Sequence, residues 1–455
     1  MYASPLNAIK TRLVRDLLDD VLMELLYGAK LAGLVYNLKI TPEGLLLIVS
    51  GYHDKADLLI EQVIRALKGF NAAHDLERFN RIKERVERQY RNMDKANPLE
   101  RAEYYLKYLI KETMWSYLEE LEELQSITAE DCDIFVKEVL ERLFIEGLIH
   151  GNISQDKALR VYKTIEDVLT PRSLSNTEKA LMKRARILPE GCQAVYPRAN
   201  ADPDNVNSGI HYYLQVGTCS SYGRDTTERE TRALAMVVAQ ILQEPCFNQL
   251  RTKEQLGYVV KSGVREEAGV LGVTISIQSE RDPVYLDHRI ETLFRERIQT
   301  MLNDMSEDDL KRQIESAAVK KLETSKNLGE ESTKYWKTIT SGFYEFDQIQ
   351  ADVDEMRKVS LETLRGFFTE RIHPDSNLVK KLSVHIRSLK LPSPADDGRV
   401  LPGSRGHTQD GIERKEVGPT RLRDGTILVI DEADFKASLE LSKAPFPVVD
   451  LLRYS

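Results

Sequence analysis

The sequence has few cysteines, and they lie far apart. Its 455 residues include four cysteines, none of them in a C-x-x-C pair. They are Cys132, Cys192, Cys219 and Cys246. This spacing argues against a disulfide framework and against a cysteine-based zinc site, so we expect free thiols in a reducing compartment.

Long apolar runs and an excess of positive charge are also missing. No apolar segment reaches the roughly 20 residues that cross a bilayer, and the start MYASPLNAIKTRLVRDLL lacks the apolar core of a signal peptide. The formal net charge of −8 argues against nucleic-acid binding, which needs a basic face. We therefore expect a cytosolic protein that binds neither membrane nor nucleic acid, with the mitochondrial matrix as the less favoured location.

The common catalytic motifs are absent as well. The sequence contains no H-E-x-x-H or H-x-x-E-H pair, no G-x-S-x-G elbow, no Walker loop and no G-x-G-x-x-G cradle. The segment His74–Glu77 comes nearest to a metal motif, but Arg78 stands where a second ligand is needed. Because a zinc site needs at least three converging ligands, we predict no metal site in this chain.

What the chain does contain is one structural unit in two copies. In the first copy, a helical pattern at 12–31 leads to a corner at Gly33, a turn at 41–44, an apolar strand at 45–52 and a helix at 54–70. The second copy repeats this order, with the corner at Gly257, the turn at Gly269, the strand at 270–280 and a helix from 283 onward. Corner and turn glycines are 11 residues apart in the first copy and 12 in the second. Agreement across four successive elements favours a duplicated domain.

The correspondence continues further along both copies. Charged amphipathic segments at 79–110 and 310–340 predict long helices. Thr128 and Ser360 are candidate N-caps of a further helix in each copy, followed by acidic residues in the first turn. An apolar strand is expected after each of these helices, at 144–154 and at 377–388.

This pattern predicts an α+β fold with two homologous layered domains, each an antiparallel sheet packed with helices. We place the domains at 1–170 and 209–390, joined by a connector at 171–208 that includes a strand at CQAVY. Residues 391–455 are expected to form a polar loop and a C-terminal tail that docks on the body.

The segment LRTKEQLGYVV (250–260) lies at the corner of the second copy. Corner chemistry alone favours a structural interpretation, in which Gly257 ends a helix in a left-handed turn, Tyr258 starts a strand half-buried and Arg251 pairs with Glu254. The first copy favours a different one, because Leu34 stands where the second copy has Tyr258. The phenol and guanidinium are then additions to one copy, and such donors suit a carbonyl oxygen or a developing oxyanion.

Longer motifs run almost from end to end of the chain. They are YASPL, LAGLVYNL, GYHDK at 51–55, HGNIS at 150–154, EPCFNQLRTKEQLGYVV at 244–260, IQSE and PVYL within 277–286, KYW at 334–336 and SVHI at 383–386. With these motifs the chain resembles the insulin-degrading enzyme (insulysin) branch of the pitrilysin family of zinc metallopeptidases. The resemblance implies that it is the C-terminal half of such an enzyme, its two copies being the family's pitrilysin-type third and fourth domains.

The resemblance also implies roles for particular residues. Arg251 and Tyr258 match the family's R-x6-Y segment, in which both bind the substrate and the tyrosine donates to the oxyanion. The zinc ligands belong to the family's N-terminal half, so zinc is expected in the complete enzyme and not on this chain. The family's basic anion-binding stretch corresponds to ETSKNLG at 323–329, where a single lysine, Lys326, remains. This departure argues against nucleotide or polyphosphate binding there.

We therefore expect half of a zinc metalloendopeptidase that degrades short or partly unfolded peptides. The chain would form one wall of the substrate chamber and would be inactive alone. Its expected partners are a zinc-bearing N-terminal half, peptide substrates and further copies of the complete enzyme. The alternative is a non-catalytic pitrilysin-like scaffold or binding subunit.

Overall fold

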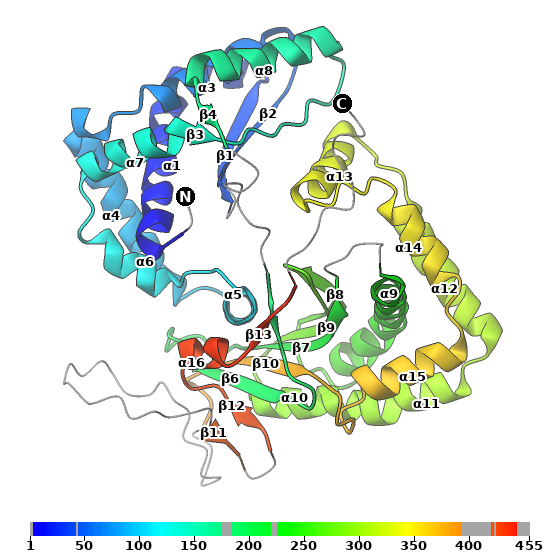
Figure 1. Ribbon diagram of the computed structural model, residues 1–455. Coiled ribbons are helices and arrows are strands. Elements are labelled where there is room, and N and C mark those ends of the chain that lie inside the picture. Colours follow the sequence, from blue (N-terminus) through cyan, green and yellow to red (C-terminus); the bar gives the residue numbers. More distant parts are fainter. Residues whose placement is uncertain are drawn as a thin grey trace. The chain divides into compact units, whose positions relative to one another are not determined.

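The computed structural model describes residues 3–41, 44–174, 184–219, 225–392, 420–422 and 425–443. The chain divides into two compact units (Figure 1). Unit 1 comprises Met1–Met93, Trp115–Leu181 and Lys326–Trp336, and unit 2 comprises Asp94–Met114, Met182–Ser325 and Lys337–Ser455. None of the described helices is long and apolar enough to cross a membrane.

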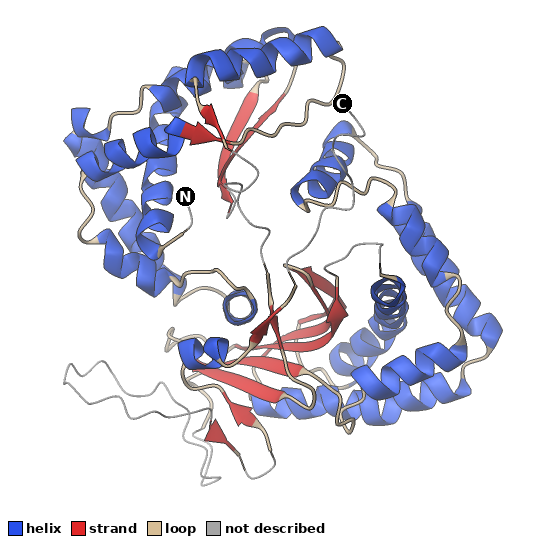
Figure 2. Cartoon of the chain, in the orientation of Figure 1, coloured by secondary structure: helices blue, strands red, loops and turns tan. Residues whose placement is uncertain are grey.

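Unit 1 is a largely helical unit around a small hairpin (Figure 2). Its elements are α1 (Pro5–Leu25), α2 (Tyr27–Leu31), β1 (Val35–Thr41), β2 (Gly44–Ser50), η1 (His53–Lys55), α3 (Ala56–Lys68), η2 (Ala72–His74), α4 (Leu76–Met93), α6 (Tyr117–Leu124), α7 (Ala129–Glu141), β3 (Arg142–Leu143), α8 (Gln155–Leu169) and β4 (Arg172–Ser173). The strands β1 and β2 pair antiparallel from Val35↔Ser50 to Thr41↔Gly44, so the predicted strand after position 44 is present and has its partner in β1. α1 begins at Pro5 because Ser4 accepts a hydrogen bond from the Asn7 N–H at 3.1 Å.

Unit 2 is built on a larger sheet. Its elements are α5 (Pro98–Ile110), β5 (Arg186–Ile187), β6 (Gln193–Ala199), β7 (Ser208–Thr218), α9 (Thr226–Cys246), η3 (Phe247–Lys253), β8 (Val259–Glu267), β9 (Val270–Ser279), α10 (Pro283–Thr292), η4 (Leu293–Ile298), α11 (Gln299–Asp304), α12 (Glu307–Leu322), α14 (Gln348–Met356), α15 (Leu361–Arg371), β10 (Lys381–Arg387), β11 (Thr420–Arg421), β12 (Ile427–Leu428), α16 (Glu432–Ala437) and β13 (Glu440–Leu441). The helix α13 (Leu328–Thr340) has residues in both units.

The seven-stranded sheet of unit 2 has the order β11-β12-β6-β10-β7-β9-β8. A hydrophobic core on one face joins its strands to α9, α10, η4, α12 and α15, and a second core on the other face joins them to α5 and α16. The layered α+β prediction is therefore confirmed. The sheet is mixed and not purely antiparallel, because β6 runs parallel to both β10 and β12.

Each predicted long charged helix is broken at an equivalent place. Asn97 caps α5 and Pro98 starts it, and Asn327 accepts a hydrogen bond from the Glu330 N–H at 2.9 Å where α13 begins. The segments after the breaks belong to different units: α5 belongs to unit 2, and residues 328–336 of α13 belong to unit 1.

The strand predicted at 144–154 is wrong. Only Arg142 and Leu143 pair, as β3, and the residues from 144 to 154 form no strand. This segment holds α13 instead, since His150 Nδ1 lies 2.8 Å from Ser332 Oγ and its ring meets the Tyr335 ring edge-on. A run of apolar residues is therefore not sufficient for a strand where no partner strand is available.

Other local predictions hold. The caps at Thr128 and Ser360 both form capping boxes. The strand at CQAVY is β6, which joins the large sheet. In the C-terminal region, β13 pairs with β5 and Phe435 is buried. Most of the polar loop predicted after residue 391 lies outside the described residues, as does the end of the C-terminal tail. The predicted domain boundaries remain a prediction.

Candidate functional site

The corner that carries Arg251 and Tyr258 begins where α9 widens. At Phe247 the helix passes into a π-helical turn, η3, that ends at Lys253. Two buried leucines, Leu250 and Leu256, hold the corner to the core, and the Leu256 N–H donates to the Leu250 carbonyl at 2.9 Å. π-Helical turns of this kind often occur at functional sites.

Arg251 is held between two aromatic rings. Its guanidinium carbon lies 4.6 Å from the centre of the Phe247 ring and 5.0 Å from that of Tyr258. Stacking on ring faces fixes the plane of a guanidinium while its N–H groups still point outward in that plane. The Tyr258 side chain is 84% exposed. The stack therefore presents a forked donor and a phenolic O–H together at the surface of unit 2.

The predicted ion pair between Arg251 and Glu254 is wrong. The Glu254 carboxylate accepts two hydrogen bonds from Arg289, at 2.7 and 2.8 Å, and one from Gln249 at 2.8 Å. The Arg289 hydrogen bond lowers the pKa of Glu254. No carboxylate among the described residues pairs with Arg251, so its donors are available to a ligand.

The predicted role of Gly257 also needs correction. The left-handed residue of this corner is Gln255, with φ of +50°. Gly257 is required for close approach, because a Cβ there would lie 1.9 Å from the carbonyl oxygen of Gln278. The corner thus depends on contact between two backbones and not on a glycine of positive φ.

Leu34 and Tyr258 occupy corresponding places at the two corners but differ in exposure. Both corners have the same register, since Val35 pairs with Ser50 and Val259 with Gln278. Leu34, however, is 8% exposed, whereas Tyr258 is 84% exposed. Tyr258 is therefore not a core residue that replaces a leucine, and the prediction of a half-buried ring is wrong.

Lys326 is in unit 1, just before α13, whereas Arg251 and Tyr258 are in unit 2. Its backbone N–H donates to the Glu330 carboxylate at 2.8 Å. Lys326 is therefore next to an acidic residue and not within a basic stretch.

Across the described ranges, no three side chains of His, Cys, Asp or Glu gather around a point that could hold a metal ion. The four cysteines are free and buried, and burial raises the pKa of Cys132 and of Cys246 to about 12. We assign no zinc-dependent step to these described residues.

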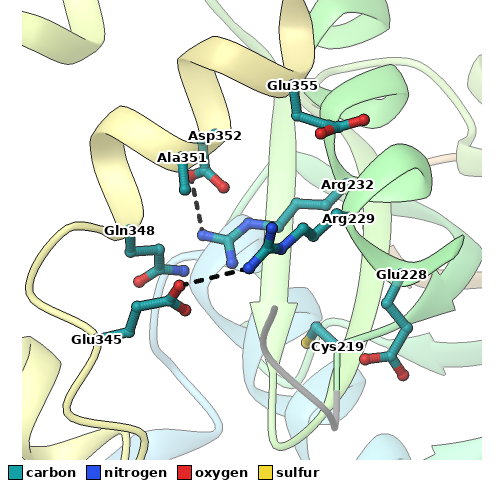
Figure 3. A pocket seen from close by; sticks show the side chains of 9 residues that line it. All are labelled: Cys219, Glu228, Arg229, Arg232, Glu345, Gln348, Ala351, Asp352 and Glu355. Atoms are coloured by element: carbon teal, nitrogen blue, oxygen red, sulfur yellow. Dashed lines mark hydrogen bonds and ion pairs between the residues drawn. The ribbon is translucent and has the colours of Figure 1, made fainter. Parts of the chain in front are cut away.

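A separate polar recess lies between α9 and α14 (Figure 3). Arg232 pairs there with Asp352 at 3.1 Å, and Arg229 lies 4.0 Å from Glu345. Burial raises the pKa of Glu345. Both arginines of this recess are close to carboxylates of the same unit, which distinguishes them from Arg251.

Sequence reasoning missed two residues of the corner. Phe247 is four residues before Arg251, a spacing that places two side chains on the same side of a helix and could have indicated the stack. Arg289 is 35 residues from Glu254 and gave no local signal.

Two family models match the chain. One, described as the middle or third domain of peptidase M16, matches residues 1–123. The other, described as the C-terminal lobe domain 4 of the PQQ synthase PqqF-like group, matches residues 237–336.

Among curated proteins, the chain is 34% identical to insulin-degrading enzyme of Homo sapiens over 395 residues, which is 86% of this chain and 38% of that protein. It is 32% identical to the peroxisomal insulin-degrading enzyme-like 1 of Arabidopsis thaliana over 424 residues, 92% of this chain and 43% of that protein. The chain therefore spans about two fifths of the length of these relatives.

Solved structures share the fold. Pitrilysin matches with a TM-score of 0.76 at 18% identity, covering 97% of this chain and 43% of that one. A peptidase M16 inactive domain from Pseudomonas fluorescens matches with a TM-score of 0.55 at 13% identity, covering 79% of this chain and 83% of that one.

Proposed function

The chain belongs to the pitrilysin family of zinc metallopeptidases, on the branch of insulin-degrading enzymes, and on this basis we propose that it forms the substrate-binding part of a peptidase active site. In this proposal the zinc ligands come from a separate N-terminal half. The chain supplies one wall of the chamber in which short or partly unfolded peptides are hydrolysed. Without the zinc-bearing half it has no peptidase activity.

One observation carries the proposal: the stacked pair at the corner of unit 2 keeps its hydrogen-bond donors uncommitted. Among the described residues Arg251 stacks on the Phe247 and Tyr258 rings and has no ion pair, whereas Arg289 donates two hydrogen bonds to Glu254. A residue that served only to stabilise the corner would be expected to make such an ion pair itself. Two donors held ready at an exposed position suit a ligand rich in carbonyl oxygens.

Arg251 is proposed to bind the substrate main chain. A guanidinium offers five N–H donors in a fixed fork and cannot lose its charge at working pH. Its stack on two rings positions the fork before substrate arrives, so little side-chain entropy is lost on binding.

Tyr258 is proposed to stabilise the tetrahedral intermediate. Hydrolysis of a peptide bond converts the scissile carbonyl oxygen into an oxyanion, and the phenolic O–H can donate a hydrogen bond to it without itself ionising. Removing one such donor commonly lowers turnover by about 10²–10³-fold.

The experiment is reconstitution of activity from two parts. This chain is mixed with a separately expressed zinc-bearing N-terminal half from a relative, and cleavage of a quenched fluorescent peptide is followed. We expect no cleavage from the chain alone, cleavage from the mixture, and a strong loss with Tyr258→Phe. The matched control is Tyr27→Phe, which removes the hydroxyl of another exposed tyrosine, 63% exposed in α2 of unit 1, and should leave turnover unchanged.

The alternative, a non-catalytic scaffold or binding subunit, predicts a different result. The two parts would associate, as measured by sedimentation, and the mixture would still not cleave peptide. That outcome would reject the catalytic proposal in favour of the scaffold.

A further inference from the structure

The strand that follows Tyr258 lies at the edge of its sheet. β8 is the last strand of the seven-stranded sheet, and among the described strands it pairs with β9 alone, from Val259 to Glu267 (Figure 1). Most of β9 is buried, whereas no residue of β8 is. An edge strand of this kind presents a row of N–H and C=O groups that another extended backbone can pair with.

The register of the hairpin shows which groups face the open side. The turn between β8 and β9 consists of Ala268 and Gly269, with φ of +49° and +91°, as a type I′ turn requires. The pair that flanks such a turn is hydrogen-bonded, and bonded pairs then alternate along the ladder. Val260, Ser262 and Val264 fall at the positions not bonded to β9. Their N–H and C=O groups face the open side, and no backbone hydrogen bond from the described residues reaches them.

The usual protections of an edge are weak here. Proteins block exposed edges with proline, charged side chains or β-bulges. Residues 259–264 contain no proline, their register with β9 has no shift, and Lys261 is their only charged residue. Val260 and Val264 pack against the core of unit 2, which anchors the strand, and the Cα of Gly263 has open space beside it.

We propose that the edge of β8 from Val259 to Val264 binds an extended peptide main chain as an added strand, with the peptide continuing past Tyr258 and Arg251. This inference rests on the proposed function and names how the substrate is held. Donors and acceptors that alternate along a straight edge complement an extended backbone and do not select side chains. The site is continuous with the stacked pair, because Tyr258 immediately precedes β8 and Arg251 contacts its ring.

The test exploits the fact that strand pairing uses every second N–H of the added peptide. The intact chain is titrated into a fluorescein-labelled, proline-free ten-residue peptide rich in valine, threonine and tyrosine, and fluorescence anisotropy is measured. Two derivatives carry N-methyl groups, one on every second residue and one on every residue. The first keeps one edge with free N–H groups and should bind like the parent, whereas the second keeps none and should bind at least about tenfold more weakly; this difference is the alternating N-methyl effect. Equal binding of both derivatives, or no binding of the parent up to about 1 mM, overturns the proposal.

The protein side of the pairing is tested at Ser262. Ser262→Pro removes an N–H that faces the open side, a place where an edge strand tolerates proline, and should weaken binding of the parent peptide about tenfold. Ser262→Ala is the matched control, because it keeps the N–H and loses only the hydroxyl, and it should bind like the wild type. Should the proline variant fail to fold by circular dichroism, the two N-methylated peptides still decide the question.

The results separate this inference from the proposed function. If turnover of the reconstituted enzyme depends on Tyr258 but the alternating N-methyl effect is absent, strand addition is wrong and the proposed function stands. If the alternating effect is present and the mixture never cleaves peptide, the edge binds peptide and the catalytic proposal fails. If Ser262→Pro instead dissociates a dimer of the chain, a second copy occupies the edge and the inference is overturned.

Discussion

Gly257→Ala tests how the corner that presents Tyr258 is built. The new Cβ would lie 1.9 Å from the carbonyl oxygen of Gln278 and 2.9 Å from its carbonyl carbon. Ordinary contact begins at about 3.4 Å, so the two backbones must separate by roughly 1.5 Å. That separation breaks the pairing of Val259 with Gln278, the first of the β8–β9 ladder.

The cost follows from these contacts. Loss of one or two ladder hydrogen bonds, together with the overpacking, should lower the free energy of unfolding by about 2–4 kcal/mol. The matched control is Gly263→Ala in the same strand, where a Cβ meets no heavy atom within 4 Å. This control should be neutral or more stable by up to about 1 kcal/mol, because alanine restricts the unfolded chain.

The assay is urea denaturation followed by circular dichroism, with turnover of the reconstituted enzyme as a second readout. Gly257→Ala should unfold at lower urea and lose activity, while Gly263→Ala should not lower the urea midpoint. Equal unfolding midpoints for the two variants would refute the close approach of the backbones as the reason for glycine at this corner.

Two further predictions concern buried and half-buried charges. Burial, with a smaller contribution from a nearby arginine, lowers the pKa of His211 from 6.5 to about 4. As the pH falls below 6.5, His211 takes up a proton in the unfolded chain but not yet in the folded one. The free energy of unfolding should therefore drop by about 2 kcal/mol between pH 7 and pH 5. His211→Gln should abolish this drop. The same dependence of the free energy of unfolding on pH in wild type and variant, measured by urea denaturation, would contradict the prediction. Arg289→Met should lower the free energy of unfolding by about 1–2 kcal/mol, since Glu254 loses two charge-assisted hydrogen bonds. Arg357→Met, which breaks the more exposed pair with Glu315, should cost less than about 0.5 kcal/mol, and equal losses in the two variants would count against the anchoring role of Arg289.

Much of the fold is predictable from the sequence because its signals are local. The caps at Thr128 and Ser360 depend on side chains within one helical turn, and the strands β2, β9 and β10 have apolar runs with partners beside them. The segment 144–154 has a similar apolar run but no partner strand, so the same signal leads to a wrong prediction there.

The candidate site was only partly predictable for a related reason. Arg251 and Tyr258 are recognisable as additions to one copy, but their surroundings depend on contacts between distant residues. The pairing of Glu254 with Arg289 spans 35 residues, and the approach of Gly257 to Gln278 depends on strand register. A left-handed glutamine, Gln255, has no sequence signal, since glutamine does not favour that conformation.

The central claim is that Arg251 and Tyr258 act on substrate and do not merely complete a corner. Turnover of a quenched peptide by the reconstituted enzyme with Tyr258→Phe tests it most directly, because the ring that stacks on Arg251 is retained and only the hydroxyl is lost. We predict a fall in kcat of about 10²–10³-fold with the urea midpoint unchanged. Undiminished kcat in this variant, measured beside an active wild-type mixture, would contradict the account.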